Sequence, residues 1–178
     1  LFANTETIEA MTDEALDALK HGEVQQARHV LALLASEIVI TVTSIPLASY
    51  PAAVKAVVPL IDQGKIEEAK AALQSALSTL VEERSVLPLP VLRAKLLLKR
   101  AEPLVEDGQR SEASNERLET LLNEARQQLE MAELLGYGKR KDFEPLYAEL
   151  KKIKEKTGGG GCGKGWLDEV KAKLSRLF

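Results

Sequence analysis

Residues 59–69 read Pro-Leu-Ile-Asp-Gln-Gly-Lys-Ile-Glu-Glu-Ala, and 44 positions later residues 103–113 read Pro-Leu-Val-Glu-Asp-Gly-Gln-Arg-Ser-Glu-Ala. A fainter copy upstream keeps the spacing of Ile61, Gly64 and Ala69 in the residues Leu19, Gly22 and Ala27. Self-similarity at a fixed period is typical of a repeated supersecondary unit. The repeat predicts helical hairpins, an architecture used more often for binding than for catalysis.

Each repeat predicts a short helix, a glycine turn, a longer helix and a Pro-rich return. The glycine is expected to adopt the left-handed conformation that closes the first helix. The alanine five positions later allows the second helix to approach closely. A proline five positions before the glycine removes a helical hydrogen bond, so we expect both strong copies to share a kinked shape.

Helical spacing of apolar residues and helix-breaking residues predict where the helices lie. We expect helices at residues 4–20, 23–43, 51–63, 65–84, 91–107, 110–135, 142–156 and 166–178, with Pro-rich connections at 44–51 and 85–90. The β-branched run Ile-Val-Ile-Thr-Val-Thr at 38–43 would suit a strand locally. Because the sequence offers it no strand-like partner, we interpret the run as a buried helix end.

These elements predict an all-α fold, a compact bundle of antiparallel helical hairpins with Pro-rich returns. Two or three copies are too few for an open solenoid. The expected organisation is a helical-hairpin bundle domain at residues 1–157, a flexible Gly-rich linker at 158–165, and a C-terminal amphipathic helix at 166–178.

Composition and charge fit an ordinary soluble helical protein, with 45% apolar, 29% charged and only 4% aromatic residues. The apolar runs fall short of the roughly 20 residues that span a bilayer. Residues 1–138 carry 13 basic and 21 acidic side chains, whereas residues 139–178 carry 11 basic and 6 acidic. This asymmetry suggests that the basic tail lies on the acidic body, on a neighbouring subunit or on an anionic surface.

The chain resembles the YfdX proteins, a bacterial all-helical family. The resemblance rests on the Gly-x-x-x-x-Ala hairpins at Gly64/Ala69 and Gly108/Ala113, on the Leu-Pro-Leu-Pro return at 87–90, and on Glu-Leu-Leu-Gly-Tyr-Gly at 133–138, followed by Tyr147-x-x-Leu150. It implies a stress-associated protein without established enzymatic activity, exported to the periplasm in many members, for which chaperone-like or ligand-binding roles have been proposed. No catalytic or metal-binding motif accompanies it.

The motifs that could carry chemistry fail on their spacing, so we expect no enzymatic activity, no catalytic residue, no cofactor and no metal. Residues 158–164 match the start of a P-loop, but Gly165 stands where Ser or Thr is needed. His21 and His29 lack the Glu-x-x-His pattern of a helical di-iron site. Cys162 is the single cysteine and has no histidine nearby in sequence to act as its base.

Nucleic-acid binding is not expected. The basic residues at 139–141 and 151–156 fit a solvated helix face, because the net charge is −3 and no recognition motif is present.

Five aromatic residues are candidates for contacts with an apolar ligand or a partner: Tyr50, Tyr137, Phe143, Trp166 and Phe178. The alternative is that they are core or loop-anchoring residues. The terminal helix, which Trp166 and Phe178 bracket, favours docking on this or a neighbouring subunit over lying at a membrane surface.

The leading hypothesis is a stress-response protein that binds unfolded clients or small apolar molecules and forms a homo-oligomer. The alternatives are a helical-repeat scaffold for one partner protein and a membrane-surface protein anchored by residues 166–178. Because the chain begins at Leu1 rather than at a methionine, we expect its targeting region to lie outside this sequence. Periplasmic localisation, with the cytoplasm as alternative, rests on the resemblance.

Overall fold

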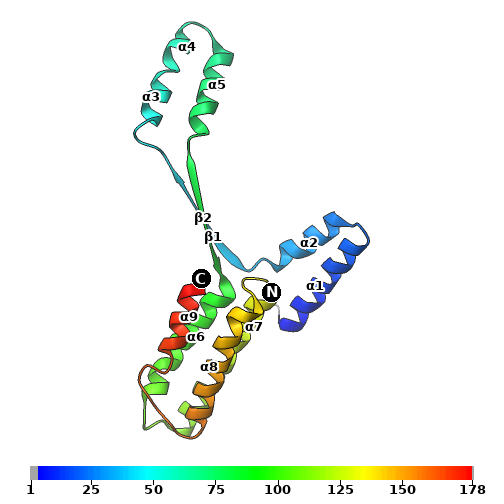
Figure 1. Ribbon diagram of the computed structural model, residues 1–178, viewed down its shortest axis with the longest axis vertical. Helices are drawn as coiled ribbons and strands as arrows, with labels where there is room; N and C mark the ends of the chain where they lie inside the picture. Colours follow the sequence, from blue (N-terminus) through cyan, green and yellow to red (C-terminus); the bar gives the residue numbers. More distant parts are fainter. Residues whose placement is uncertain (1–3, 178) are drawn as a thin grey trace. The chain divides into compact units, whose positions relative to one another are not determined.

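The structure, a computed structural model, describes residues 4–177 (Figure 1). Its contacts divide the chain into two compact units: a main unit of residues 1–38 and 87–178, and an inserted unit of residues 39–86. The elements follow one another as α1 (Thr5–Lys20), α2 (Val24–Leu34), β1 (Glu37–Ser44), α3 (Tyr50–Lys55), α4 (Val58–Asp62), α5 (Ile66–Leu77), β2 (Val81–Pro88), α6 (Leu89–Glu106), α7 (Glu112–Leu134), α8 (Arg140–Gly158) and α9 (Asp168–Leu177). The predicted all-α class is confirmed for the bulk of the described chain, to which one small two-stranded sheet is added.

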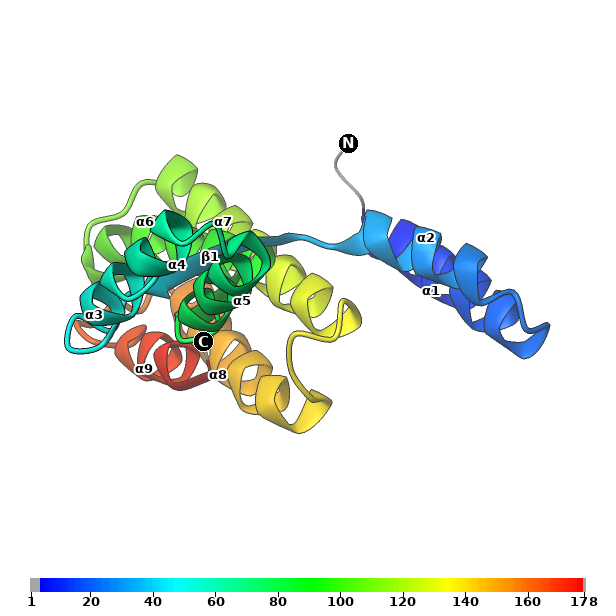
Figure 2. The ribbon, with the colours of Figure 1, turned by 90° about the horizontal axis from the view of Figure 1, so that it is seen from above.

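The core of the main unit lies between α6, α7, α8 and α9, which Figures 1 and 2 show side by side. Apolar residues recur every three or four positions along these helices, so each helix buries one face. The fully enclosed side chains include Leu98 of α6, Leu129 of α7, Leu146 of α8, and Val170 and Leu174 of α9.

The terminal helix α9 is part of this core. Its residues Val170 and Leu174, together with Leu167 before it, are buried there, and Trp166 packs against the same cluster. The apolar face expected either to dock or to meet a membrane is therefore covered by the chain itself.

The α1–α2 hairpin forms a second, smaller core from Ala15, Ala18, Ala27 and Val30. Asn4 caps α1, because its side-chain oxygen accepts a hydrogen bond from the backbone N–H of Thr7 at 2.9 Å. The turn between the helices contains Gly22 at φ +79°, and Ala27 is buried where α2 approaches α1. The first copy of the repeat therefore has the predicted shape.

The inserted unit contains the short helices α3 and α4 packed against α5. Gly64 lies at φ +71° between α4 and α5, and Ala69 is buried as predicted. Its other buried apolar residues are Val57 and Ala76.

The interpretation of residues 38–43 as a buried helix end was wrong. Helix α2 ends at Leu34, and β1 pairs with β2 in a two-stranded sheet whose residues are almost all exposed. The partner strand, Val-Glu-Glu-Arg-Ser-Val-Leu-Pro at 81–88, occupies the end of the predicted helix 65–84 and most of the predicted connection at 85–90. The charged residues at the centre of this segment resemble those of a helix surface, so the sequence did not indicate a strand. Pairing with this segment holds β1 in the extended conformation that β-branched residues favour.

The third copy of the repeat departs from the prediction at each of its marker residues. Pro59 lies in the first turn of α4, whereas Pro103 lies inside helix α6, so the two prolines do not hold equivalent positions. Gly108 lies outside the positive-φ region that Gly22 and Gly64 adopt, and Ala113 is exposed. The helix–turn–helix order is preserved, but the backbone conformation of the turn differs.

Candidate functional site

The structure does not gather the five predicted aromatic contacts into one site. Tyr50 begins α3 of the inserted unit, whereas Tyr137, Phe143 and Trp166 belong to the main unit. Phe178 lies outside the described residues.

The three aromatic residues in the main unit each have a structural contact. Phe143 is fully buried, and its ring stacks on that of Tyr147 at a centroid distance of 6.2 Å. The hydroxyl of Tyr137 accepts a hydrogen bond from the backbone N–H of Ser36 at 3.0 Å. The Nζ atom of Lys156 lies over the Trp166 ring, 5.0 Å from the ring centroid.

The surroundings of two tyrosines raise the pKa values of their hydroxyl groups. Burial raises the pKa of Tyr147, and its hydroxyl donates to the Glu133 carboxylate at 2.7 Å, which raises that pKa further. Burial also raises the pKa of Tyr137, and the hydrogen bond from Ser36 partly opposes that effect. Both phenols are protonated at neutral pH and serve to hold elements together.

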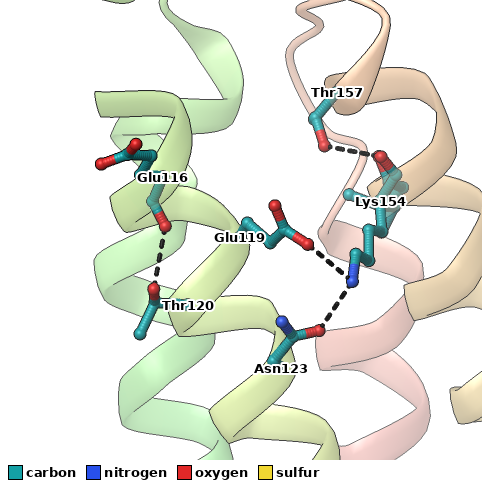
Figure 3. Close-up of polar contacts among 7 residues, drawn as sticks. Glu116, Glu119, Thr120, Asn123, Lys154 and Thr157 are labelled. Atoms are coloured by element: carbon teal, nitrogen blue, oxygen red, sulfur yellow. Dashed lines mark hydrogen bonds and ion pairs between the residues drawn. The ribbon is translucent and has the colours of Figure 1, made fainter. Parts of the chain in front are cut away.

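A polar groove of about 280 Å³ lies between α7 and α8 (Figure 3). Lys154 reaches across to α7, where its Nζ lies 2.8 Å from the Glu119 carboxylate and 3.1 Å from the Asn123 side-chain oxygen. The hydrogen bond and the charge of Lys154 lower the pKa of Glu119. The Thr157 hydroxyl donates to the Ile153 carbonyl at 2.9 Å. Lys154 therefore ties α8 to α7, while the Thr157 hydroxyl bonds within its own helix.

The inserted unit carries a large exposed apolar surface. Its large apolar side chains are mostly 40–55% exposed, and Leu47 is 82% exposed. We use the name ribbon surface for the exposed apolar residues of this unit: Val39, Ile40, Val42, Ile45, Leu47, Val54, Val58, Ile61, Ile66, Leu73, Leu77, Val81 and Val86. Exposed apolar side chains in such number are typical of a unit that interacts with proteins or apolar ligands.

The strands within the ribbon surface also have unpaired edges. A two-stranded sheet leaves the outer backbone N–H and C=O groups of both strands without a strand partner, and edge strands are usually protected by charged side chains. Residues 38–54 contain no charged residue, so β1 carries a charge only at its first residue, Glu37, whereas β2 carries Glu82, Glu83 and Arg84. Sequence reasoning missed this surface, although the long uncharged β-branched stretch was a signal for it.

The described residues hold no group of three or more His, Cys, Asp or Glu side chains arranged to bind a metal ion. Between residues 4 and 177, no helix combines the length and the apolar character needed to cross a membrane.

Comparison with models of protein families matches residues 1–86 to the model described as YfdX protein. The match spans the α1–α2 hairpin, β1, the helices of the inserted unit and β2 up to Val86. Of the motifs that carried the resemblance, the Gly64/Ala69 hairpin lies inside the match, while those from residue 87 onward lie outside it. No curated protein and no solved structure matches the chain.

Proposed function

Because residues 1–86 of the chain belong to the YfdX family, we propose that the protein is a non-enzymatic stress-response protein of YfdX type that binds apolar segments of unfolded client proteins. The observation that carries this proposal is the ribbon surface, which lies entirely within the matched residues. Small apolar molecules are a second class of ligand for the same surface.

The ribbon surface suits extended polypeptide in two ways. A client segment in extended conformation adds to a free strand edge through main-chain hydrogen bonds, which do not depend on its sequence. Its apolar side chains then cover the Val and Ile residues of β1, which alternate between the two faces of the ribbon. Recognition of this kind selects for apolar, unfolded chain rather than for one partner.

The energetics favour weak and reversible binding. Fully burying a Val, Leu or Ile side chain contributes about 1.5–3 kcal/mol, so covering a half-exposed one contributes roughly 1 kcal/mol. A micromolar complex needs about 8 kcal/mol net of the association cost. Contact with a few residues is therefore insufficient, and useful affinity requires a client that covers most of the ribbon surface.

The same surface supports the homo-oligomer expected from the sequence. A two-stranded sheet with exposed apolar faces is marginal by itself, and additional strands or packing against another element stabilise it. A second copy of the chain supplies both, and clients then compete with self-association. The proposed location is the periplasm, as in many YfdX proteins. Fractionation of cells that express the protein tests it against the cytoplasm.

The test compares wild type with Ile40→Thr/Val42→Thr, which keeps β-branched side chains while removing apolar surface from β1. We expect wild type to suppress aggregation of heated citrate synthase and the double variant to lose most of that activity. Leu33→Gln, which removes an exposed leucine from α2, is the control and should behave as wild type. Equal suppression by the double variant, or no suppression by wild type, would refute the proposal.

A further inference from the structure

A second groove, of about 480 Å³, runs between α6 and α7 of the main unit. Its lining comes from Arg93, Leu96, Leu97 and Arg100 of α6 and from Glu124, Gln127 and Gln128 of α7. The volume lies within the range of small-molecule sites. All of these residues lie outside the YfdX match and outside the ribbon surface, so the groove is a different site from the one proposed for clients.

The α7 wall of this groove is polar, because Glu124, Gln127 and Gln128 form it. The side-chain oxygen Oε1 of Gln128 is itself buried, so a molecule in the groove does not contact that atom.

The α6 wall presents two unpaired cations on either side of apolar surface. Arg93 and Arg100 are exposed and have no ion pair or hydrogen bond to residues 4–177. Seven positions apart, they share one helix face and lie roughly 10 Å from each other along the axis. Leu96, which is 51% exposed, lies between them.

The charges lining the groove favour an anion. Arg93 and Arg100 outnumber the single carboxylate, that of Glu124. Guanidinium groups bind carboxylates in a bidentate manner, with greater strength than neutral hydrogen-bond donors provide. The adjoining leucines add apolar contact, which an inorganic anion cannot use.

We propose that this groove binds small amphipathic organic carboxylates. The carboxylate pairs with Arg93 or Arg100, and the apolar part covers Leu96 and Leu97. The charge and the apolar surface together define a ligand class that neither defines alone.

Dansylglycine is a suitable probe, because it combines a carboxylate with an apolar fluorescent ring system. Titration into the full chain, followed by dansyl emission, is expected to give saturable binding. Arg93→Gln/Arg100→Gln should weaken binding about tenfold or more, the effect of losing a charged hydrogen bond. Lys99→Gln/Arg117→Gln removes the same charge from exposed positions outside the groove and should leave affinity within about twofold.

Two further measurements separate the groove from other sites. Dansylglycinamide, which lacks the carboxylate, should bind wild type weakly and should not distinguish it from Arg93→Gln/Arg100→Gln. Ile40→Thr/Val42→Thr should keep wild-type affinity.

Three results would overturn the inference. The first is that dansylglycine binding does not saturate up to about 1 mM. The second is that Arg93→Gln/Arg100→Gln and Lys99→Gln/Arg117→Gln lose affinity equally. The third is a loss of affinity in Ile40→Thr/Val42→Thr. The last would place the probe on the ribbon surface. Failure of client binding with an intact dansylglycine site would contradict only the proposed chaperone-like function.

Discussion

The guanidinium of Arg110 donates through Nη2 to the backbone carbonyl of Gly161 at 2.6 Å, joining two turns 51 positions apart. Its Nη1 donates to the carbonyls of Leu104 and Asp107, each at 2.8 Å. The last carbonyls of a helix lack intrahelical partners, so one side chain both caps α6 and fixes the Gly-rich segment. Gly163 adds a backbone hydrogen bond to the Val105 carbonyl at 3.1 Å. The segment expected to be a flexible tether therefore has defined contacts with α6 and the turn that follows it.

Replacing Arg110 by Gln should lower the free energy of unfolding by about 2 kcal/mol, because charged hydrogen bonds to several carbonyls are lost together. Arg117→Gln, at an exposed position on α7, should change it by less than about 0.5 kcal/mol. Urea unfolding measures both, and hydrogen exchange at the Gly163 amide reports on the segment directly. Equal stabilities of the two variants would show that the Arg110 contacts contribute nothing.

Truncating Leu174 of α9 to Ala should destabilise the main unit by about 2–5 kcal/mol, the usual cost of removing a fully buried leucine. Leu177→Ala, at a residue 38% exposed on the same helix, should cost much less. Thermal unfolding followed by Trp166 fluorescence compares them. If Leu174→Ala were as stable as Leu177→Ala, α9 could not be part of the core in solution.

Gly64→Ala should destabilise the inserted unit by about 1–2 kcal/mol, because Gly64 adopts φ +71°, where an L-residue with a Cβ is strained. A Cβ at this position meets no atom within 4 Å, so the cost is conformational rather than steric. Gly158→Ala also meets no atom but lies in the last turn of α8, where alanine should be neutral or slightly stabilising. Circular dichroism melts of the two variants should therefore shift in different directions, and a common loss of stability would contradict this account.

The Glu119 carboxyl should titrate below its ordinary range, because the hydrogen bond and charge of Lys154 favour its ionised form. Lys154→Met should return its pKa towards the ordinary value in a carboxyl ¹³C NMR titration. The stabilisation from this lowered pKa is present above the ordinary pKa of a glutamate and is lost as pH falls through the lowered one. The stability difference between wild type and Lys154→Met should therefore shrink in acid and in high salt. An unchanged Glu119 pKa in the variant would exclude Lys154 as the cause.

The helical hairpins could be predicted because Gly22, Gly64 and Gly108 interrupt strongly periodic sequence, and α1, α2, α4, α5, α6 and α7 flank them in the predicted order. The strands could not, because pairing between residues 37–44 and 81–88 is a tertiary event across 36 intervening residues. Local preference at 38–43 pointed to a strand, but the partner's Glu82, Glu83 and Arg84 resembled a helix surface.

The candidate sites could not be predicted either, because they too depend on contacts between segments far apart in the sequence. Whether the Val and Ile residues of β1 are buried or exposed is decided by what packs on them, and periodicity within one segment does not specify that. Gln128 and Arg93 resemble ordinary surface residues in sequence, and only the packing of α6 on α7 brings them into one groove.

The backbone N–H of Leu89 donates to the carbonyl of Ser36 at 2.8 Å, so the main unit closes on itself at the point where the inserted unit departs and returns. No residue of 39–86 contributes to the buried core of the main unit. Residues 39–86 therefore form an insertion whose two ends lie close together and whose side chains take no part in the core of the main unit. Removing this insertion, or exchanging it for another, would then change what the protein binds without changing any core residue of the main unit.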